Sequence, residues 1–155
     1  MDIHDLHDNP ARIACVAALL YAEWSAFPRW SSAPAIESAL RQRGVASDYA
    51  FTLGMFTPDD NAVATASIIR YELQDCPERE YWLGEVVTAP SQRGKGLATA
   101  LVNACVARCQ QQGIEMLYLY TPDKQALYAR MGWQPLEQRP VAGEIVTVMR
   151  LSLGK

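Results

Sequence analysis

The segment Val86–Thr99 combines residue types that bind a phosphate-bearing ligand. It reads Val-Val-Thr-Ala-Pro-Ser-Gln-Arg-Gly-Lys-Gly-Leu-Ala-Thr, the pattern of a strand, a tight turn and the start of a helix. The first amides of a helix have no intrahelical acceptor and carry partial positive charge. Gly94 and Gly96 let an anion approach the backbone, and Arg93 and Lys95 add formal positive charge. The segment therefore predicts a pyrophosphate site.

Two other phosphate-binding patterns fit this segment less well. The dinucleotide fingerprint Gly-x-Gly-x-x-Gly needs a third glycine, and Thr99 stands in its place. A P-loop needs Gly-Lys-Ser/Thr after a longer glycine loop, which Gly94-Lys95-Gly96 does not provide. An ATP-binding protein is therefore disfavoured.

Two separated motifs together resemble the GNAT superfamily of N-acetyltransferases. The family pattern Arg/Gln-x-x-Gly-x-Gly/Ala is matched by Arg93, Gly96 and Ala98. The preceding Val-x-x-Pro is matched by Val87 and Pro90. The C-terminal pattern Leu-Tyr-x-x-x-Gly-Phe/Trp is matched by Leu127, Tyr128, Gly132 and Trp133. The resemblance is close from about Tyr81 to Trp133 and covers the N-terminal third only in outline.

This resemblance implies an acetyl-CoA-dependent N-acetyltransferase in which the amine attacks the thioester directly. No cysteine or serine nucleophile and no metal are then required. Backbone groups of Val86, Val87 and Thr88 would bind the pantetheine arm. The pyrophosphate would lie beside Arg93 on the amides of Gly94, Lys95, Gly96, Leu97, Ala98 and Thr99.

The resemblance also makes Tyr128 the expected general acid. A tyrosine with a pKa near ~10 stays protonated at neutral pH and can give a proton to the departing thiolate. The alternative is that Tyr128 is a core aromatic residue. Glu85, on the strand before the cofactor contacts, is the candidate general base, and a carboxylate facing solvent at the strand edge is the alternative.

Two departures from the family pattern leave the base open. Some relatives place a glutamate near the end of the strand Leu117–Thr121, where this chain has Tyr120, and many carry an asparagine where Thr121 stands. A water chain or an amine arriving as the free base would also serve. The competing function is a non-catalytic acyl-CoA-binding or regulatory module. The acceptor is expected to be a primary amine of a small molecule or a peptide.

The elements that would position these residues follow from the hydrophobic pattern. We expect strands at Tyr49–Phe56, Ala62–Tyr71, Tyr81–Thr88, Glu115–Thr121 and Glu144–Leu153. We expect helices at Pro10–Trp24, Ala35–Arg43, Gly96–Gln112 and from Pro122 to Met131, with the second ending at Gly44. The expected fold is α/β (α+β) and GNAT-like, with a mixed, mostly antiparallel sheet of about six to seven strands flanked by about four helices.

Length and composition favour one domain, residues 1–155, of an ordinary globular protein. A formal net charge of −3 argues against non-specific nucleic-acid binding. No apolar run approaches the ~20 residues that span a bilayer, so no membrane association is expected. Four cysteines without a Cys-x-x-Cys pair are interpreted as reduced and mostly buried, which indicates a cytoplasmic protein. A homodimer is expected only by family analogy.

Three further groups carry weaker hypotheses. Trp24, Phe27 and Trp30 line the acceptor pocket or simply pack in the core. The helix end Arg41–Arg43 is expected to be exposed. The N-terminal histidines and aspartates, a conceivable metal cluster, are expected to lie in a frayed terminus; they are Asp2, His4, Asp5, His7 and Asp8.

Overall fold

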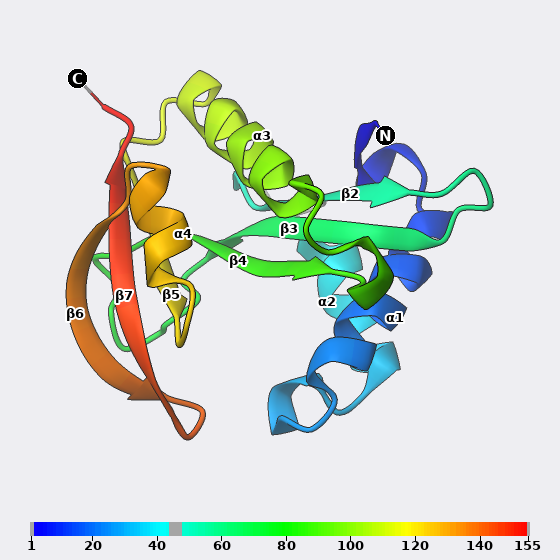
Figure 1. The fold of residues 1–155 in the computed structure, drawn as a ribbon, viewed down its shortest axis with the longest axis horizontal. Helices are drawn as coiled ribbons and strands as arrows, with labels where there is room; N and C mark the ends of the chain where they lie inside the picture. Colours follow the sequence, from blue (N-terminus) through cyan, green and yellow to red (C-terminus); the bar gives the residue numbers. More distant parts are fainter. Residues whose placement is uncertain (1, 44–47, 155) are drawn as a thin grey trace.

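The protein is built around one twisted seven-stranded sheet, with helices on both faces (Figure 1). This computed structural model describes residues 2–43 and 48–154. The strands are β1 (Ile3–Asp5), β2 (Phe51–Phe56), β3 (Ala62–Arg70), β4 (Tyr81–Thr88), β5 (Met116–Thr121), β6 (Gln134–Val141) and β7 (Glu144–Ser152). The α-helices are α1 (Ala11–Trp24), α2 (Ala33–Arg43), α3 (Leu97–Gln111) and α4 (Gln125–Arg130). Short 3-10 helices are η1 (Leu6–Asp8), η2 (Pro28–Trp30) and η3 (Pro90–Gln92).

The strand order is β1-β2-β3-β4-β5-β7-β6, and the expected mixed, mostly antiparallel sheet is confirmed. Every neighbouring pair is antiparallel except β4 and β5, which run parallel with α3 as the crossover between them. All the strands and helices expected from the pattern are present, with ends shifted by a few residues. The expected end of α2 at Gly44 lies outside the described residues.

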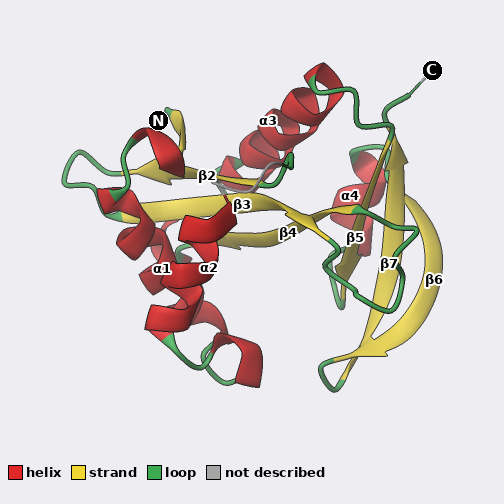
Figure 2. Ribbon diagram, turned by 180° about the vertical axis from the view of Figure 1, so that it is seen from behind, coloured by secondary structure: helices red, strands yellow, loops and turns green. Residues whose placement is uncertain are grey.

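Helices lie on both faces of the sheet (Figure 2), and the core forms two layers, one on each face. On one face, Leu101 and Cys105 of α3 pack against Ala66 and Ile68 of β3. On the other, Val16 and Leu20 of α1 pack with α2. Because helices cover both faces, the inner strand β2 is buried at all its positions and lacks a polar alternation.

Two strands, β1 and β6, were not predicted from the sequence. The N-terminal segment, expected to be frayed, instead forms β1, which pairs Ile3 with Met55 and Asp5 with Leu53. Arg108 of α3 also donates to the Asp5 carboxylate at 2.5 Å. The edge strand β6 contains Pro135 and, like other edge strands, is largely exposed, so no apolar alternation marks it.

Candidate active site

The strand β4 carries a bulge that splits its side chains between the two faces of the sheet. Ser67 of β3 is paired with Gly84, and Thr65 is paired with Val87. Between these pairs, β3 has one residue and β4 has two, Glu85 and Val86, which defines the bulge. Glu85 adopts φ 54° at this bulge. As a result, Gly84 and Glu85 both face the α1–α2 side, whereas Val86 packs in the layer under α3.

The strands β4 and β5 separate just before this bulge. Their only register pair in the described chain is Trp82 with Tyr118, and beyond it the two strands diverge (Figure 1). We call this opening the fork. The edge of β4 that faces the fork has no strand partner there, so its backbone groups are free to bind an extended ligand.

The loop after β4 presents a run of unpaired amides. In the described structure, no carbonyl or side chain accepts from the backbone N–H groups of residues 94–99. Gly94 and Gly96 have φ 78° and 77°, the left-handed conformation that glycine adopts without strain. A Cβ built at either glycine meets nothing within 4 Å. We call this open loop of unpaired donors, residues 94–99, the cradle. Its place at the start of α3 suits it to bind an anion.

The two basic residues of the loop lie beside the cradle. Arg93 donates to the carbonyl oxygen of Thr88 at 3.1 Å and to Glu23 of α1 at 2.8 Å. Lys95 Nζ donates to Gln92 at 3.1 Å. The side chains of Arg93 and Glu23 are about half and one-third exposed, so this ion pair is weak and can rearrange around a ligand.

Tyr128 lies in the core layer next to Trp133, at a ring separation of 6.1 Å. It is 7% exposed, and burial raises its pKa to about 12. Its hydroxyl has no hydrogen-bond partner within the described part of the chain. The side chain is therefore a core aromatic residue that still carries a protonated, uncommitted hydroxyl at neutral pH.

Glu85 is buried, which corrects the alternative of a carboxylate facing solvent. Its two oxygens accept from Arg43 at 2.7 and 3.0 Å, and Ser67 donates to it at 2.7 Å. Arg43 also donates to Thr52 at 2.9 Å. The side chains of Arg43 and Glu85 are only 9% and 3% exposed.

The electrostatics of this pair reflect two opposing effects. Burial alone would raise the pKa of Glu85, but the charge and hydrogen bonds of Arg43, with the Ser67 hydroxyl, more than offset it. The net pKa lies below the ordinary value. Glu85 is therefore a weak proton acceptor with both oxygens occupied. A role for it as general base stays a prediction that requires Arg43 to release an oxygen first.

Arg43 is the residue that sequence reasoning placed wrongly. It was expected at an exposed helix end, but it closes the buried network under the bulge. No local signal marks it, because its partner Glu85 lies 42 residues away in the sequence. Its neighbour Arg41 does match the expectation, with a half-exposed side chain paired to Glu37.

Two of the four cysteines are poorly suited to act as nucleophiles. All four are free, and Cys105 and Cys109 are buried under the sheet while Cys15 and Cys76 are half-buried. Burial raises the pKa of the Cys109 thiol to about 12 and that of Cys105 further, so both stay protonated. Residues 2–43 and 48–154 contain no cluster of side chains suited to a metal ion. None of the described helices is long and apolar enough to cross a membrane.

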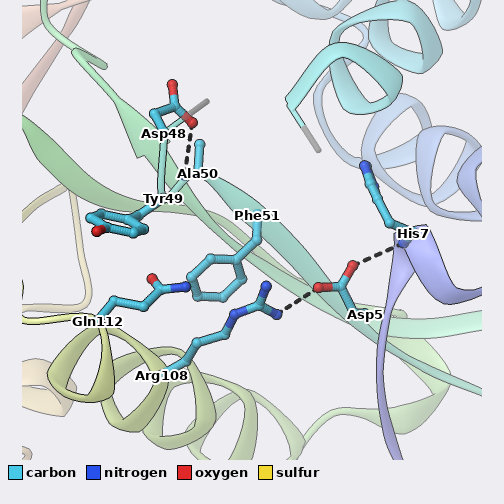
Figure 3. Close-up of a pocket in the computed structure, with 8 residues that line it drawn as sticks. All are labelled: Asp5, His7, Asp48, Tyr49, Ala50, Phe51, Arg108 and Gln112. Carbon is cyan, nitrogen blue, oxygen red and sulfur yellow. Dashed lines mark hydrogen bonds and ion pairs between the residues drawn. The ribbon is translucent and has the colours of Figure 1, made fainter. Parts of the chain in front are cut away.

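A separate polar pocket of about 170 Å³ lies between β1, β2 and the C-terminal end of α3 (Figure 3). Arg108 and Asp5 form an ion pair at its edge, and the Arg108 guanidinium lies 4.1 Å from the centre of the Phe51 ring. The cradle, Tyr128 and Glu85 are not among its lining residues. It is therefore distinct from the predicted site.

Comparison with known proteins identifies a family and a fold. A family model described as the acetyltransferase (GNAT) family matches residues 16–133. No curated protein matches the chain. An aminoglycoside 6'-acetyltransferase type Ii is similar, with 18% identity, a TM-score of 0.77, and coverage of 99% of this chain and 97% of that one. An aminoglycoside 6'-N-acetyltransferase in complex with coenzyme A has 16% identity, a TM-score of 0.74, and coverage of 99% and 97%.

A third solved structure is a GNAT superfamily phosphinothricin acetyltransferase from Sinorhizobium meliloti in complex with acetyl-CoA. It has 17% identity and a TM-score of 0.77, with coverage of 99% of this chain and 88% of that one. At these identities the likeness concerns the fold.

Proposed function

This chain belongs to the acetyltransferase (GNAT) family, and we propose that it is an enzyme that transfers the acetyl group of acetyl-CoA directly to a primary amine of a small molecule or peptide. The observation that carries the proposal is the cradle of unpaired amides at residues 94–99, placed at the end of the strand that borders the fork. Two of the similar structures hold coenzyme A or acetyl-CoA, which supports the same cosubstrate here.

The cradle residues divide the expected contacts with acetyl-CoA between them. The amides of Gly94, Lys95, Gly96, Leu97, Ala98 and Thr99 would donate to the pyrophosphate. Arg93 and Lys95 would add charge once Arg93 leaves Glu23. The free edge of β4 at Val86, Val87 and Thr88 would bind the amide groups of the pantetheine arm. These contacts would direct the thioester into the fork.

Tyr128 would supply the proton for the leaving group. The amine nitrogen forms a bond to the acetyl carbon as the carbon–sulfur bond breaks, and the Tyr128 hydroxyl protonates the sulfur. The protonated acceptor gives up two protons in all: one restores Tyr128, and the other passes to solvent. The raised pKa keeps Tyr128 protonated at neutral pH but makes it a weaker acid than an exposed tyrosine, so its proton moves only as the bond breaks.

A thermal melt tests the cosubstrate. Acetyl-CoA or CoA at ~100 times its dissociation constant should stabilise the fold by about 2.7 kcal/mol, which raises the Tm by several degrees in a chain of this size. ATP and NAD should leave the Tm unchanged. Release of free thiol from acetyl-CoA with a panel of amines then tests catalysis. Binding of CoA without turnover of any amine would favour the acyl-CoA-binding module, an outcome consistent with the paired state of Glu85.

The glycine at the start of α3 allows a sharper test of the cradle. Gly96→Ala puts a methyl group into the open space and strains φ 77°, at a cost of about 1–2 kcal/mol in stability. Displacing the pyrophosphate from charge-assisted bonds should weaken CoA binding about tenfold or more. The measurement is the Kd for CoA by calorimetry.

The matched control lies at the opposite end of the same helix. Gly113 has φ 79° and likewise nothing within 4 Å of a built Cβ. Gly113→Ala should lose similar stability and keep the CoA affinity. Equal loss of affinity in both variants would show that backbone strain, not occupation of the cradle, is responsible.

A further inference from the structure

A second carboxylate, Glu72, lies at the fork on the same side as Glu85. The Glu72 side chain is 5% exposed, although it follows β3 in a loop. Arg29 of η2 donates to its two oxygens at 3.0 and 3.2 Å, and the Tyr120 hydroxyl lies 3.4 Å from Oε1. Three separate parts of the chain thus meet at one buried carboxylate.

The position of this carboxylate is set by the divergence of β4 and β5. Gly84 and Tyr120 follow the last paired residues, Trp82 and Tyr118, and have no register partner across the fork. A Cβ built on Gly84 would lie 3.7 Å from Oε1 of Glu72. Glu72 therefore lies over the mouth of the fork, next to the strand that the proposed cosubstrate would line.

The two carboxylates at the fork differ in how firmly their arginines are held. The side chain of Arg43 is 9% exposed and also donates to Thr52, so it is held firmly against Glu85. The side chain of Arg29 is 49% exposed, and its guanidinium lies 4.8 Å from the centre of the Trp30 ring. A long, half-solvated side chain regains its hydration when it leaves, but its departure uncovers a buried anion that needs another cation.

We infer that Glu72 is the binding site for the ammonium group of the acceptor and that Arg29 is a cover which the acceptor displaces. An incoming cation replaces one ion pair by another, whereas a neutral or anionic molecule would leave the buried carboxylate unpaired. Trp30, freed of Arg29, offers an aromatic face to the same cation or its apolar body. The acceptor class is thus a primary amine that is protonated at neutral pH and carries an apolar or aromatic group.

The inference rests on the proposed function and narrows its substrate class. It also gives a role to Tyr120, which departs from the family pattern at this position. The pKa of Tyr120 is raised to about 12, first by burial and then by the charge of Glu72. Its hydroxyl therefore stays a hydrogen-bond donor that fixes the Glu72 carboxylate.

The test compares Glu72→Gln and Arg29→Gln with the parent protein, using 2-phenylethylamine, a cation at pH 7.5, and aniline, which is neutral there. Glu72→Gln should raise the KM for 2-phenylethylamine about tenfold or more. Arg29→Gln removes the competing cation and should lower the same KM by about threefold or more. The opposite signs distinguish an acceptor site from a structural ion pair, whose loss would impair both variants alike. Aniline gains nothing from the buried anion, so its KM should not rise in Glu72→Gln.

The control is Glu80→Gln, which removes a carboxylate from the same β3–β4 connection. Glu80 pairs with Arg70 at 2.8 Å, and both side chains are about 40% exposed. The KM values of the Glu80→Gln variant should equal those of the parent protein. Calorimetry with 2-phenylethylamine added to the CoA complex gives the same comparison as Kd values, without turnover.

The outcomes separate the two proposals. Failure of CoA to bind, or failure of every amine to be acetylated, overturns the proposed function. If CoA binds but 2-phenylethylamine does not, or if both Glu72→Gln and Arg29→Gln weaken its binding, the assignment of Glu72 is wrong. An Arg29→Gln variant that loses affinity only for acceptors bearing a carboxylate would also overturn it, since Arg29 would then be the binding group.

Discussion

Replacing Arg43 with methionine is expected to lower the free energy of unfolding by about 3–5 kcal/mol, because it leaves Glu85 as an unpaired charge in the protein interior. The side chain of Arg43 forms four hydrogen bonds to Thr52, Ser67 and Glu85. At about 2–4 °C per kcal/mol for a chain of this size, the Tm should fall by roughly 10 °C. Urea unfolding measures the loss.

The matched control is Arg41→Met on the same helix. Its side chain is 51% exposed and pairs with Glu37 four residues away, an arrangement worth about 0.5 kcal/mol or less. The double variant Arg43→Met with Glu85→Met removes both buried charges and should recover much of the loss. If Arg43→Met and Arg41→Met cost the same, the ion pair under the bulge does not stabilise the fold.

The pH dependence of stability follows from the direction in which folding shifts the pKa of Glu85. Its pKa is depressed in the folded state, so its contribution is present above the unfolded pKa of about 4.3 and is lost as the pH falls through the folded pKa. In Arg43→Met the uncompensated burial should raise this pKa instead. The stability difference between the parent and Arg43→Met should therefore narrow as the pH falls from 7. A constant difference would contradict the depressed pKa.

Tyr128→Phe is expected to reduce kcat by about 10²- to 10⁴-fold, the range for loss of a general acid. The Kd for CoA should be unchanged, since only one hydroxyl is removed from a ring that remains packed against Trp133. The stability should hardly change, because that hydroxyl has no hydrogen-bond partner in residues 2–43 or 48–154. The measurement is turnover with saturating acetyl-CoA and an accepted amine.

A second buried tyrosine provides the control. Tyr81 is 8% exposed in the same core layer, and burial raises its pKa as well. It lies at the first residue of β4, away from the cradle. Tyr81→Phe should therefore keep kcat. Full turnover by Tyr128→Phe would remove the general-acid role and leave Tyr128 as a core residue.

The cradle is the part of the site that could be predicted residue by residue. Gly94 and Gly96 follow a buried strand and precede a helix, and each of these features is encoded within a few neighbouring residues. Left-handed φ values and unpaired amides at a helix start arise from the local chain alone. The family motifs and the helix that follows the loop could be predicted for the same reason.

The two strands that could not be predicted from the sequence, β1 and β6, form only because a neighbouring strand pairs with them. The segment Ile3–Asp5 is too short and polar to show a period, and it is a strand only because β2 supplies a partner edge. The exposed strand β6 depends similarly on β7. A strand is stabilised by its contacts with neighbouring strands, so the local sequence pattern alone cannot predict it.

By itself, the sequence determined the family motifs, the order of the central elements and the glycine loop that precedes α3. Only the tertiary structure decided the state of the charged residues. Arg43 and Glu85 are 42 positions apart, and Arg29 and Glu72 are 43 apart, yet each pair is joined through two hydrogen bonds. Whether a carboxylate is a free base, a fixed structural anion or a covered binding site depends on burial and on the partner that the fold brings to it. Those quantities exist only once the chain has folded.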